Sequence, residues 1–345
     1  MKVELNKLPV KTTNHFHINE CILDLTVPEY KGYQDLSIQG EVDSLQIEEV
    51  LKEETITSKI GLKFSKYKEL KITIPKGVEI QNPILLDYIF REDDCFIDKI
   101  IIEYEEDSKC NFMITYLSAD EGSHFHHLIE EVTSKKNSKG NITYINMMNQ
   151  NSMNFIAMEN KNYQNSEIIH NYIDIGGNIR VYNIDAELLE ENSFNHINTI
   201  YVGNQKDQID MNYNIKNIAK NTNSQIVVEG AIDEECQKTF RGTIDFIPGC
   251  ENSIGIENEN CILLSDNCVS KSLPQLLCGE ENVTGAHGVS SGKISSEKLF
   301  YLMSRGYEKK DAERLIIMTN FHKIIKQIPS EYVQEFITNN IERMI

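Results

Sequence analysis

Short runs of β-branched and aromatic residues, broken by Asn, Asp and Gly, extend from about residue 12 to about residue 292. Almost no sustained helical period interrupts them. Apolar runs of this length, separated by turn-forming residues at intervals of roughly ten residues, are typical of a β-sandwich, a barrel or a β-solenoid. Clear examples are 142–147, 168–173, 179–184 and 226–232.

Asparagine occupies many of the breaks between these runs, including Asn149, Asn151, Asn154, Asn160, Asn162 and Asn165. In a solenoid the coils stack in register, so equivalent turn residues lie above one another and Asn side chains bond along the stack. We therefore prefer a parallel β-solenoid. Biased codon usage is the competing explanation for the asparagines, because no exact repeat is visible.

The pattern changes after Gly292, where apolar residues recur at helical spacing. A short helix is predicted over 296–303, stopped at Gly306 in a left-handed cap. A second is predicted over 309–328, ended by Pro329, with Ser330 capping a third. The residues expected to face inward are Leu299, Phe300 and Met303; Ala312, Leu315, Ile316, Ile324, Ile325 and Ile328; and Val333, Phe336, Ile337 and Ile341.

Charge divides the chain at the same place. Residues 1–292 carry 25 Lys and Arg against 46 Asp and Glu, whereas residues 293–345 carry 9 against 7. The tail is therefore predicted to be a separate helical module, which either plugs the end of the β body or docks a partner. The net charge of -19 argues against DNA or RNA as a main partner, because phosphate binding depends on clustered Lys and Arg.

The N-terminal residues show neither the apolar core of a signal peptide nor a membrane span, and apolar runs elsewhere are short. We therefore expect a cytoplasmic protein without membrane association. Its eight cysteines form no CxxC pair and are expected to be reduced. Cys236, Cys250, Cys261 and Cys268 alternate with apolar strand residues, which predicts mainly structural roles.

One motif fails a test for nucleotide binding. Residues 285–294 superficially resemble a phosphate-binding loop, but GxxxxGK[ST] requires Gly at the position of His287 and a hydroxyl at Ile294. Neither is present. We assign no nucleotide to this chain and expect any ATP hydrolysis in a partner subunit.

A histidine cluster gives a weaker signal. His124 and His126, followed by His127, share a face if their segment is a strand, which is one way in which a metal site begins. No HExxH motif or Cys pair completes a ligand set, so solvated strand histidines are the preferred interpretation. The acidic runs 105–107 and 130–131 are likewise predicted to be solvated, although a glycosidase-like carboxylate pair is an alternative.

Cys278 and His287 lie nine residues apart, where one strand is expected to end, turn at Gly279 and return before Gly285. A thiolate and an imidazole suit iron or an iron–sulfur cluster. Two ligands do not close a site, so the others would come from another subunit or from the sulfides of the cluster. A buried cysteine and a hydrogen-bonded core histidine are the alternative interpretation.

Six motifs in the C-terminal third occur in a recognisable order. They are Gly230-Ala231, Phe240-Arg241-Gly242-Thr243-Ile244, Leu263-Leu264-Ser265, Ser272-Leu273-Pro274-Gln275-Leu276, and the segments 286–294 and 299–306. Together they resemble the SufB/SufD family of iron–sulfur cluster assembly proteins over roughly residues 210 to 325. The resemblance implies a right-handed parallel β-helix that pairs with a second subunit, and C-terminal helices that dock a SufC-type ABC ATPase. The domains expected are an N-terminal segment over 1–60 that packs on or extends the core, the β-helix over 61–292, and the helical module over 293–345.

At the residue level the resemblance implies that Cys278 and His287 are metal ligands holding a transient iron–sulfur cluster. Phe300, Tyr301, Arg305 and Gly306 would mark the element leading to the docked ATPase. The chain combines a SufB-like cysteine with a SufD-like Gly288 after the histidine, where SufB members usually have Glu. It also lacks their long N-terminal helical extension. Both departures resemble compact versions of the scaffold.

The function predicted is therefore a scaffold and not an enzyme: a subunit that assembles a nascent cluster at a subunit interface, as a homodimer or with a SufB/SufD paralogue. A sulfur donor and apo-protein recipients would be its further partners. One alternative is a SufD-like structural partner that holds no ligand. The other is a carbohydrate-active enzyme on a β-solenoid.

Overall fold

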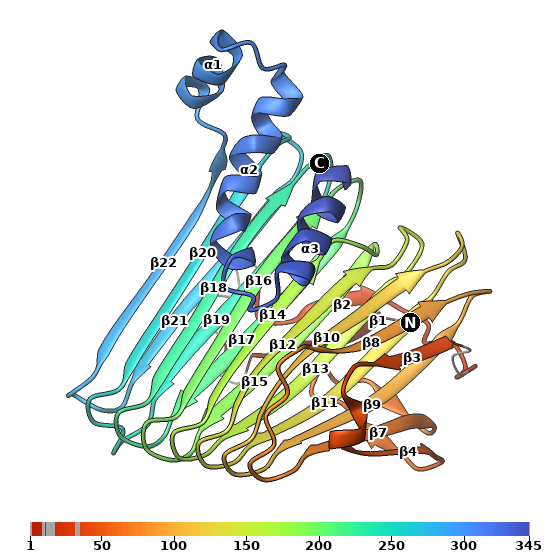
Figure 1. Ribbon diagram of the computed structural model, residues 1–345. Coiled ribbons are helices and arrows are strands. Elements are labelled where there is room, and N and C mark those ends of the chain that lie inside the picture. The colour runs from red at the N-terminus through yellow and green to blue at the C-terminus, as the bar shows by residue number, and fades with distance from the viewer. Residues whose placement is uncertain (1, 9–10, 12–17, 32–34, 345) are drawn as a thin grey trace.

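The computed structural model describes residues 2–8, 11, 18–31 and 35–344, and its centre is a parallel β-solenoid (Figure 1). One sheet has the order β22-β20-β18-β16-β14-β12-β10-β8-β3 and the facing sheet the order β21-β19-β17-β15-β13-β11-β9-β7-β4. Successive strands alternate between the sheets, so each coil contributes one strand to each. One coil takes about 30 residues, as in the pairing of Lys109 with Lys139. The predicted parallel β-solenoid is confirmed.

The strands of the first sheet are β3 (Asp35–Gln39), β8 (Ile84–Phe90), β10 (Lys109–Ser118), β12 (Lys139–Met147), β14 (Glu167–Asp174), β16 (Phe194–Gly203), β18 (Asn223–Ile232), β20 (Ile254–Leu263) and β22 (Thr284–Lys293). Those of the second are β4 (Gln46–Lys52), β7 (Tyr67–Ile74), β9 (Cys95–Tyr104), β11 (Phe125–Ser134), β13 (Met153–Asn162), β15 (Ile179–Leu188), β17 (Gln208–Asn217), β19 (Gln237–Phe246) and β21 (Val269–Cys278). The predicted runs at 142–147, 168–173, 179–184 and 226–232 lie within β12, β14, β15 and β18.

An asparagine ladder of the predicted kind runs along one row of turns and includes Asn165, whereas Asn154, Asn160 and Asn162 lie inside strand β13 and not at breaks between strands as predicted. Asn137, Asn165 and Asn192 all have positive φ, between 55° and 60°. Asn165 donates its side-chain N–H to Asn137 at 2.9 Å, and Asn192 donates to Asn165 at 3.1 Å. Asn tolerates the left-handed backbone conformation and its amide both donates and accepts, which explains its use at these turns.

The space between the sheets is filled by inward side chains at alternate positions of each strand. Ile142 and Ile184 are among these, and Tyr144 and Tyr172 stack across neighbouring coils with ring centroids 4.7 Å apart. This packing keeps successive coils aligned, and so sets the positions of the strands at the end of the solenoid.

Three helices follow the solenoid: α1 (Ser296–Ser304), α2 (Lys309–Ile325) and α3 (Glu331–Met344). Ile317 and Phe321 of α2 and Ile337 of α3 pack on the outer face of the first sheet, against residues such as Ile173 and Ile200. The prediction was wrong for Leu315, which is 42% exposed, and for Ile316, which is only half-buried, because α2 turns Ile317 and Met318 to the sheet instead. Helix α1 projects beyond the solenoid (Figure 1).

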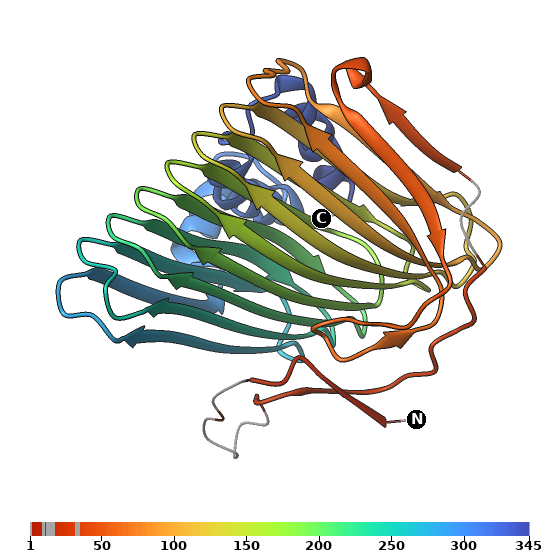
Figure 2. The ribbon, with the colours of Figure 1, turned by 90° about the horizontal axis from the view of Figure 1, so that it is seen from below.

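The N-terminal part lies on the opposite side of the solenoid (Figure 2). Strands β1 (Lys2–Leu5) and β2 (Cys21–Asp24) pair antiparallel, and their Leu5 and Leu23 pack with Phe155 and Val181 on the outer face of the second sheet. Two short strands, β5 (Ile56–Thr57) and β6 (Lys63–Phe64), and a 3₁₀ turn η2 (Val42–Ser44) complete the described elements. None of the helices in the described ranges is long and apolar enough to cross a membrane.

The two ends of the solenoid differ. At the N-terminal end, β3 and β4 pair antiparallel with β8 and β7 and so close both sheets with strands of opposite direction. At the C-terminal end, β21 and β22 are the last strands, and no other strand of the described chain pairs with their outer edges. Such edges present unpaired backbone N–H and C=O groups to a further strand.

Candidate functional site

The last coil, β21 and β22, forms an open end whose inward side chains are not covered by another coil. Ser270 and Ser291 hydrogen-bond across it at 2.8 Å, and a side chain at Gly285 would contact Leu276. Both contacts imply the same alignment of the two facing strands. Each step of one residue forward along β21 corresponds to one residue back along β22. His287 therefore lies opposite Pro274, and Cys278 lies near the turn.

Cys278 and His287 both lie on the inward face of this coil and are both exposed. Cys278 follows the register of Phe246 on β19, and His287 follows that of Glu257 on β20. Cys278 lies four residues, or about 13 Å, along β21 from the position opposite His287. One iron ion therefore cannot join both side chains of a single chain, and their roles stay predictions.

Among the eight cysteines, all within the described ranges, Cys278 alone is exposed. Cys236, Cys250 and Cys261 are buried, which agrees with the structural role predicted for them, and Cys268 is half-buried. Burial raises the pKa of Cys236 to about 12, so that it holds its proton at neutral pH. Because the thiolate is the form that binds metal, Cys278 is the cysteine best placed to do so.

Glu257 lies one coil below His287 in the same row of inward side chains. It is fully buried, and its carboxyl rests against Gly242, where a Cβ would collide with it. Neither carboxyl oxygen has a hydrogen-bond partner among the described residues, although the backbone N–H of Gln275 approaches closely enough to favour the charged form. Burial, with a contribution from Glu259, raises the pKa of Glu257 to about 8.

A buried ion pair lies beside Glu257. Lys238 of β19 contacts Glu259 of β20, and both side chains are fully buried. Lys238 also donates to the Ser272 hydroxyl at 2.9 Å. The sequence motifs do not point to Glu257, Glu259 or Lys238. The alternation of Glu257, Glu259 and Cys261 was visible, but their inward direction follows only from the strand register.

The interpretation of the histidine cluster as solvated was wrong. His124, His126 and His127 are buried. His126 points inward from β11, with one ring nitrogen 3.0 Å from Asp98 and the other 2.7 Å from Asn154. His127 points outward but is covered by Phe64, and burial lowers its pKa to about 3.

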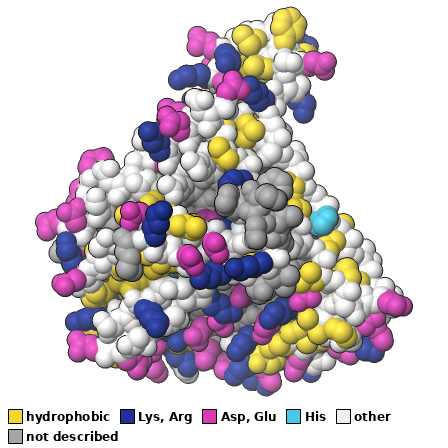
Figure 3. Space-filling model, turned by 180° about the vertical axis from the view of Figure 1, so that it is seen from behind, with side chains coloured by type: hydrophobic (Ala, Val, Ile, Leu, Met, Phe, Trp, Pro, Cys, Tyr) yellow, Lys and Arg dark blue, Asp and Glu magenta, His cyan; other side chains and the backbone are white. Residues whose placement is uncertain are grey.

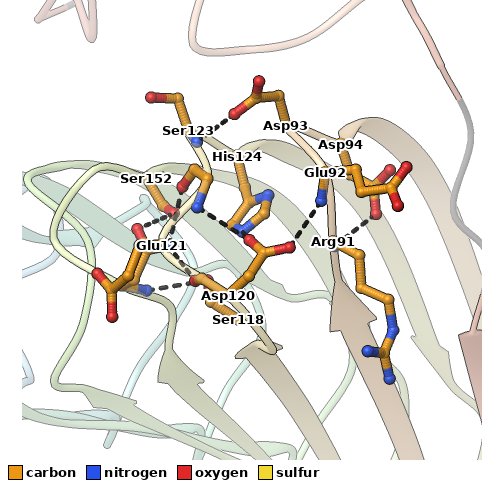
Figure 4. Close-up of polar contacts among 12 residues, drawn as sticks. Arg91, Glu92, Asp93, Asp94, Ser118, Asp120, Glu121, Ser123, His124 and Ser152 are labelled. Atoms are coloured by element: carbon orange, nitrogen blue, oxygen red, sulfur yellow. Dashed lines mark hydrogen bonds and ion pairs between the residues drawn. The ribbon is translucent and has the colours of Figure 1, made fainter.

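His124 precedes β11 at the edge of the turns (Figure 4). Its ring lies 3.2 Å from Asp120, whose carboxylate accepts from the backbone N–H groups of Glu92 and Gly122. These backbone bonds lower the pKa of Asp120. Within the described ranges, no group of three His, Cys, Asp or Glu side chains is arranged to hold a metal ion. The prediction that the acidic run at 130–131 is solvated was also wrong in part. Glu130 is buried inside the solenoid, whereas Glu131 is exposed.

The failed phosphate loop has a structural explanation. Residues 284–293 form the extended strand β22 and not a loop that opens a helix. A phosphate loop needs successive backbone N–H groups that converge on an anion, and a paired strand cannot supply them.

Helix α1 exposes apolar side chains on the projecting end of the molecule. Phe300 is 74% exposed and Tyr301 56%, although Phe300 was predicted to face inward. The Arg305 guanidinium lies 5.2 Å from the centroid of the Tyr301 ring, and Gly306 ends the helix at φ 98° in the predicted left-handed cap. Apolar side chains gather over this projection (Figure 3). Tyr301 and Leu302 also line a groove with Leu315 and Ile316 of α2.

Residues 88–320 match the family described as SUF system FeS cluster assembly, SufBD core domain. The chain belongs to this SufBD family. It is 23% identical over 292 residues to the iron–sulfur cluster assembly protein SufD of Bacillus subtilis (strain 168), covering 79% of this chain and 63% of that protein. It is 23% identical over 268 residues to the SufB protein of the same organism, covering 76% of this chain and 57% of that protein.

The family match begins within β8 and ends within α2, so it leaves out β3, β4 and β7. The SufBD chain covers less than two thirds of the length of either relative. The family is the one that the motifs between residues 210 and 325 resemble.

Proposed function

We propose that this chain is the scaffold subunit of a SUF-type assembly system. It builds a nascent iron–sulfur cluster at the interface between two solenoids, and a SufC-like ABC ATPase docks on its helices. The observation that carries the proposal is the open C-terminal end, where Cys278 and His287 lie inward on strands whose outer edges have no partner in the described chain. At the other end the last strands, β3 and β4, run antiparallel to the coils, and their outer edges also have no strand partner in the described chain.

A two-fold axis through the open end would bring the inward faces of two terminal coils together. Because Cys278 and His287 of one chain lie too far apart to share an ion, a second subunit supplies the missing neighbours. The cluster is cargo here: Cys278 thiolate and His287 imidazole would bind iron, and sulfide would join as a further ligand of the iron. The two subunits together would exclude bulk water, and the cluster would then pass to an apo-protein.

The helices have a direct connection to this end. Lys323 of α2 lies 3.3 Å from Glu229 on β18, and Glu229 accepts a hydrogen bond from Asn260 on β20 at 3.0 Å. Asn260 lies between Glu259 and Cys261 on the strand next to β22. A movement of α2 driven by ATP hydrolysis in a partner would therefore have a path of polar contacts as far as β20, the strand next to the open end.

The test is anaerobic co-purification with the SufC-like ATPase, followed by reconstitution with iron and sulfide. Wild type is expected to develop sulfide-to-iron charge-transfer absorption with a fixed iron stoichiometry, and Cys278→Ala and His287→Ala are expected to lose most of it. Cys268→Ala is the matched control, because Cys268 is half-buried and lies ten residues from Cys278.

Unchanged cluster assembly in both site variants would refute the proposal. Stable ATPase binding without a cluster in any protein would instead identify a structural partner that needs a second, ligand-bearing scaffold.

A further inference from the structure

A groove lies beside the N-terminal hairpin on the outer face of the second sheet. It has a volume of about 420 Å³ and is bordered on one side by residues 19–23. Outward side chains of four neighbouring strands form its floor, among them Val181 of β15, Gln208 of β17, Thr239 of β19 and Lys271 of β21. The proposed cluster site faces the lumen and makes no use of this groove.

The groove follows the free edge of β2. Strand β1 pairs with one edge of β2, and no strand of the described chain pairs with the other. The β1 side of the hairpin borders a different groove, which contains Lys7, Leu8 and Asn183. An edge strand presents alternate backbone N–H and C=O groups outward, so the edge of β2 that faces the first groove can pair with an added strand.

The contacts of the hairpin set the direction of β2 across the coils. Ile18, which precedes β2, lies over β19, where its carbonyl accepts a hydrogen bond from Arg241. Leu23, near the end of β2, packs with Val181 of β15 and Phe155 of β13. Strand β2 therefore runs away from the open end, and a strand added antiparallel to it runs toward β21. The floor from β15 to β21 spans three strand spacings, or about 14 Å, which is the length of about four extended residues.

The charge of the groove is unbalanced at the β21 end. Asp210 on the floor already accepts two hydrogen bonds from an arginine of β19, at 2.7 and 2.9 Å. Lys271 has no ion-pair partner among the described residues. The floor therefore keeps an unmatched ammonium group at the end that the C-terminus of an antiparallel strand reaches.

We propose that this groove binds the C-terminal tail of a partner protein as a short extended strand, antiparallel to β2, with the free carboxylate of the tail at Lys271. Main-chain hydrogen bonds to β2 supply affinity, and the amide and hydroxyl groups of the floor accept small polar side chains at alternate positions of the tail. A chain terminus suits the site because the floor ends at β21, the last strand of its sheet. The inference stands apart from the proposed function, since it needs no cluster.

The test adds a synthetic peptide to the full-length protein. The probe is a short peptide of alternating Thr and Val with a free C-terminal carboxylate and an N-terminal fluorescein, and fluorescence anisotropy measures its binding. Saturable binding is expected with a Kd below about 1 mM. Amidation of the C-terminus and Lys271→Gln are each expected to weaken binding about fivefold, because each removes one charge of the same ion pair. Methylation of the alternate peptide nitrogens that face β2 is expected to abolish binding, whereas methylation of the other set is tolerated.

Lys216→Gln is the matched control, because Lys216 is a half-buried lysine on the same outer face that lines the other groove. Circular dichroism melts check that each variant is folded. Absence of saturable binding to folded wild type overturns the inference, and so does equal binding of the free and amidated peptides. Displacement of the peptide by acetate at the same concentration identifies an anion site alone and rejects strand addition. Failure to bind peptide, together with a wild-type dimer that Lys271→Gln dissociates in light scattering, assigns the groove to a second copy of the chain instead.

Discussion

Individual polar residues inside the solenoid are where sequence and structure diverge most. Inward positions of β11 include His126 and Glu130 as well as Leu128 and Val132. Charged and imidazole side chains are mostly exposed in proteins, so the sequence pattern predicts a solvated segment. The composition predicted an asparagine ladder at the turns but only Asn165 of its named members lies in it, and Glu130 required knowledge of which strand face points inward.

Glu130 leads to a prediction about pH. Burial raises its pKa to about 8, from an ordinary value of 4.5, although Tyr144 donates a hydrogen bond to it. Between these two values the folded state binds more protons than the unfolded state, so Glu130 destabilises the fold progressively as pH rises through this window. Glu130→Gln removes this effect. Its advantage over wild type in unfolding free energy is expected to grow by about 2 kcal/mol or more from about pH 5 to about pH 9.

Urea unfolding at a series of pH values measures this difference. The neighbouring Glu131→Gln, on the exposed face of the same strand, is the control and should follow the wild-type curve. If the difference in unfolding free energy between wild type and Glu130→Gln does not change with pH, Glu130 does not titrate in this range.

Among the secondary-structure elements, the C-terminal helices followed from their apolar period to within a few residues. The second helix ends at Ile325, three residues before the predicted boundary, and its inner face is shifted toward Ile317 and Phe321. A sequence period gives the width of an apolar stripe but not which of two partners it meets. Here Leu315 and Ile316 face α1 and the groove, while the residues beside them face the sheet.

The N-terminal strands are held by a buried ionic network. Arg241 donates to both carboxyl oxygens of Asp210, at 2.7 and 2.9 Å, and to the backbone carbonyl of Ile18. Asn6 donates to Asp210 at 2.8 Å. Arg241→Ala leaves the Asp210 charge buried without its cation and is expected to cost about 3 to 5 kcal/mol of unfolding free energy.

The same variant is expected to expose the N-terminal segment to rapid proteolysis, because its anchor to β17 and β19 is lost. Lys216→Ala is the matched control on the same outer face: Lys216 lies 3.0 Å from Glu187 in a solvent-accessible pair, whose removal should cost at most about 1 kcal/mol. Equal proteolysis rates for the two variants would show that the Arg241 network does not hold the segment.

At the scale of the whole molecule, the sequence indicated stacked coils but not the asymmetry of their ends. That asymmetry comes from long-range pairing: β3 and β4 return antiparallel along β8 and β7, whereas β21 and β22 receive no such strand in the described chain. A motif search finds Cys278 and His287 but gives no distance between them. The 13 Å offset along β21, and the buried Glu257 beneath His287, follow only from the alignment of facing strands.

The asymmetry gives the last prediction, on assembly. If two copies pair through their open ends, a charge at the exposed end of the last coil must be buried without a partner and will separate the subunits. Val289, inward on β22 and 38% exposed, is such a position. Val289→Lys is expected to convert a dimeric wild type to a monomer at the same micromolar concentration, with at least a tenfold weaker dimer.

Light scattering after size-exclusion chromatography measures the mass, and Val50→Lys supplies the comparison. Val50 is similarly exposed, at 45%, but lies on β4 at the closed end. A lysine at this position would face solvent, and lysine is well tolerated on an edge strand such as β4, so the dimer should persist. Because the cluster is proposed to need ligands from both subunits, Val289→Lys should also lose reconstituted cluster while Val50→Lys keeps it. Dissociation by Val50→Lys with a stable Val289→Lys dimer would place the interface at the other end and remove the structural basis for a shared site at Cys278 and His287.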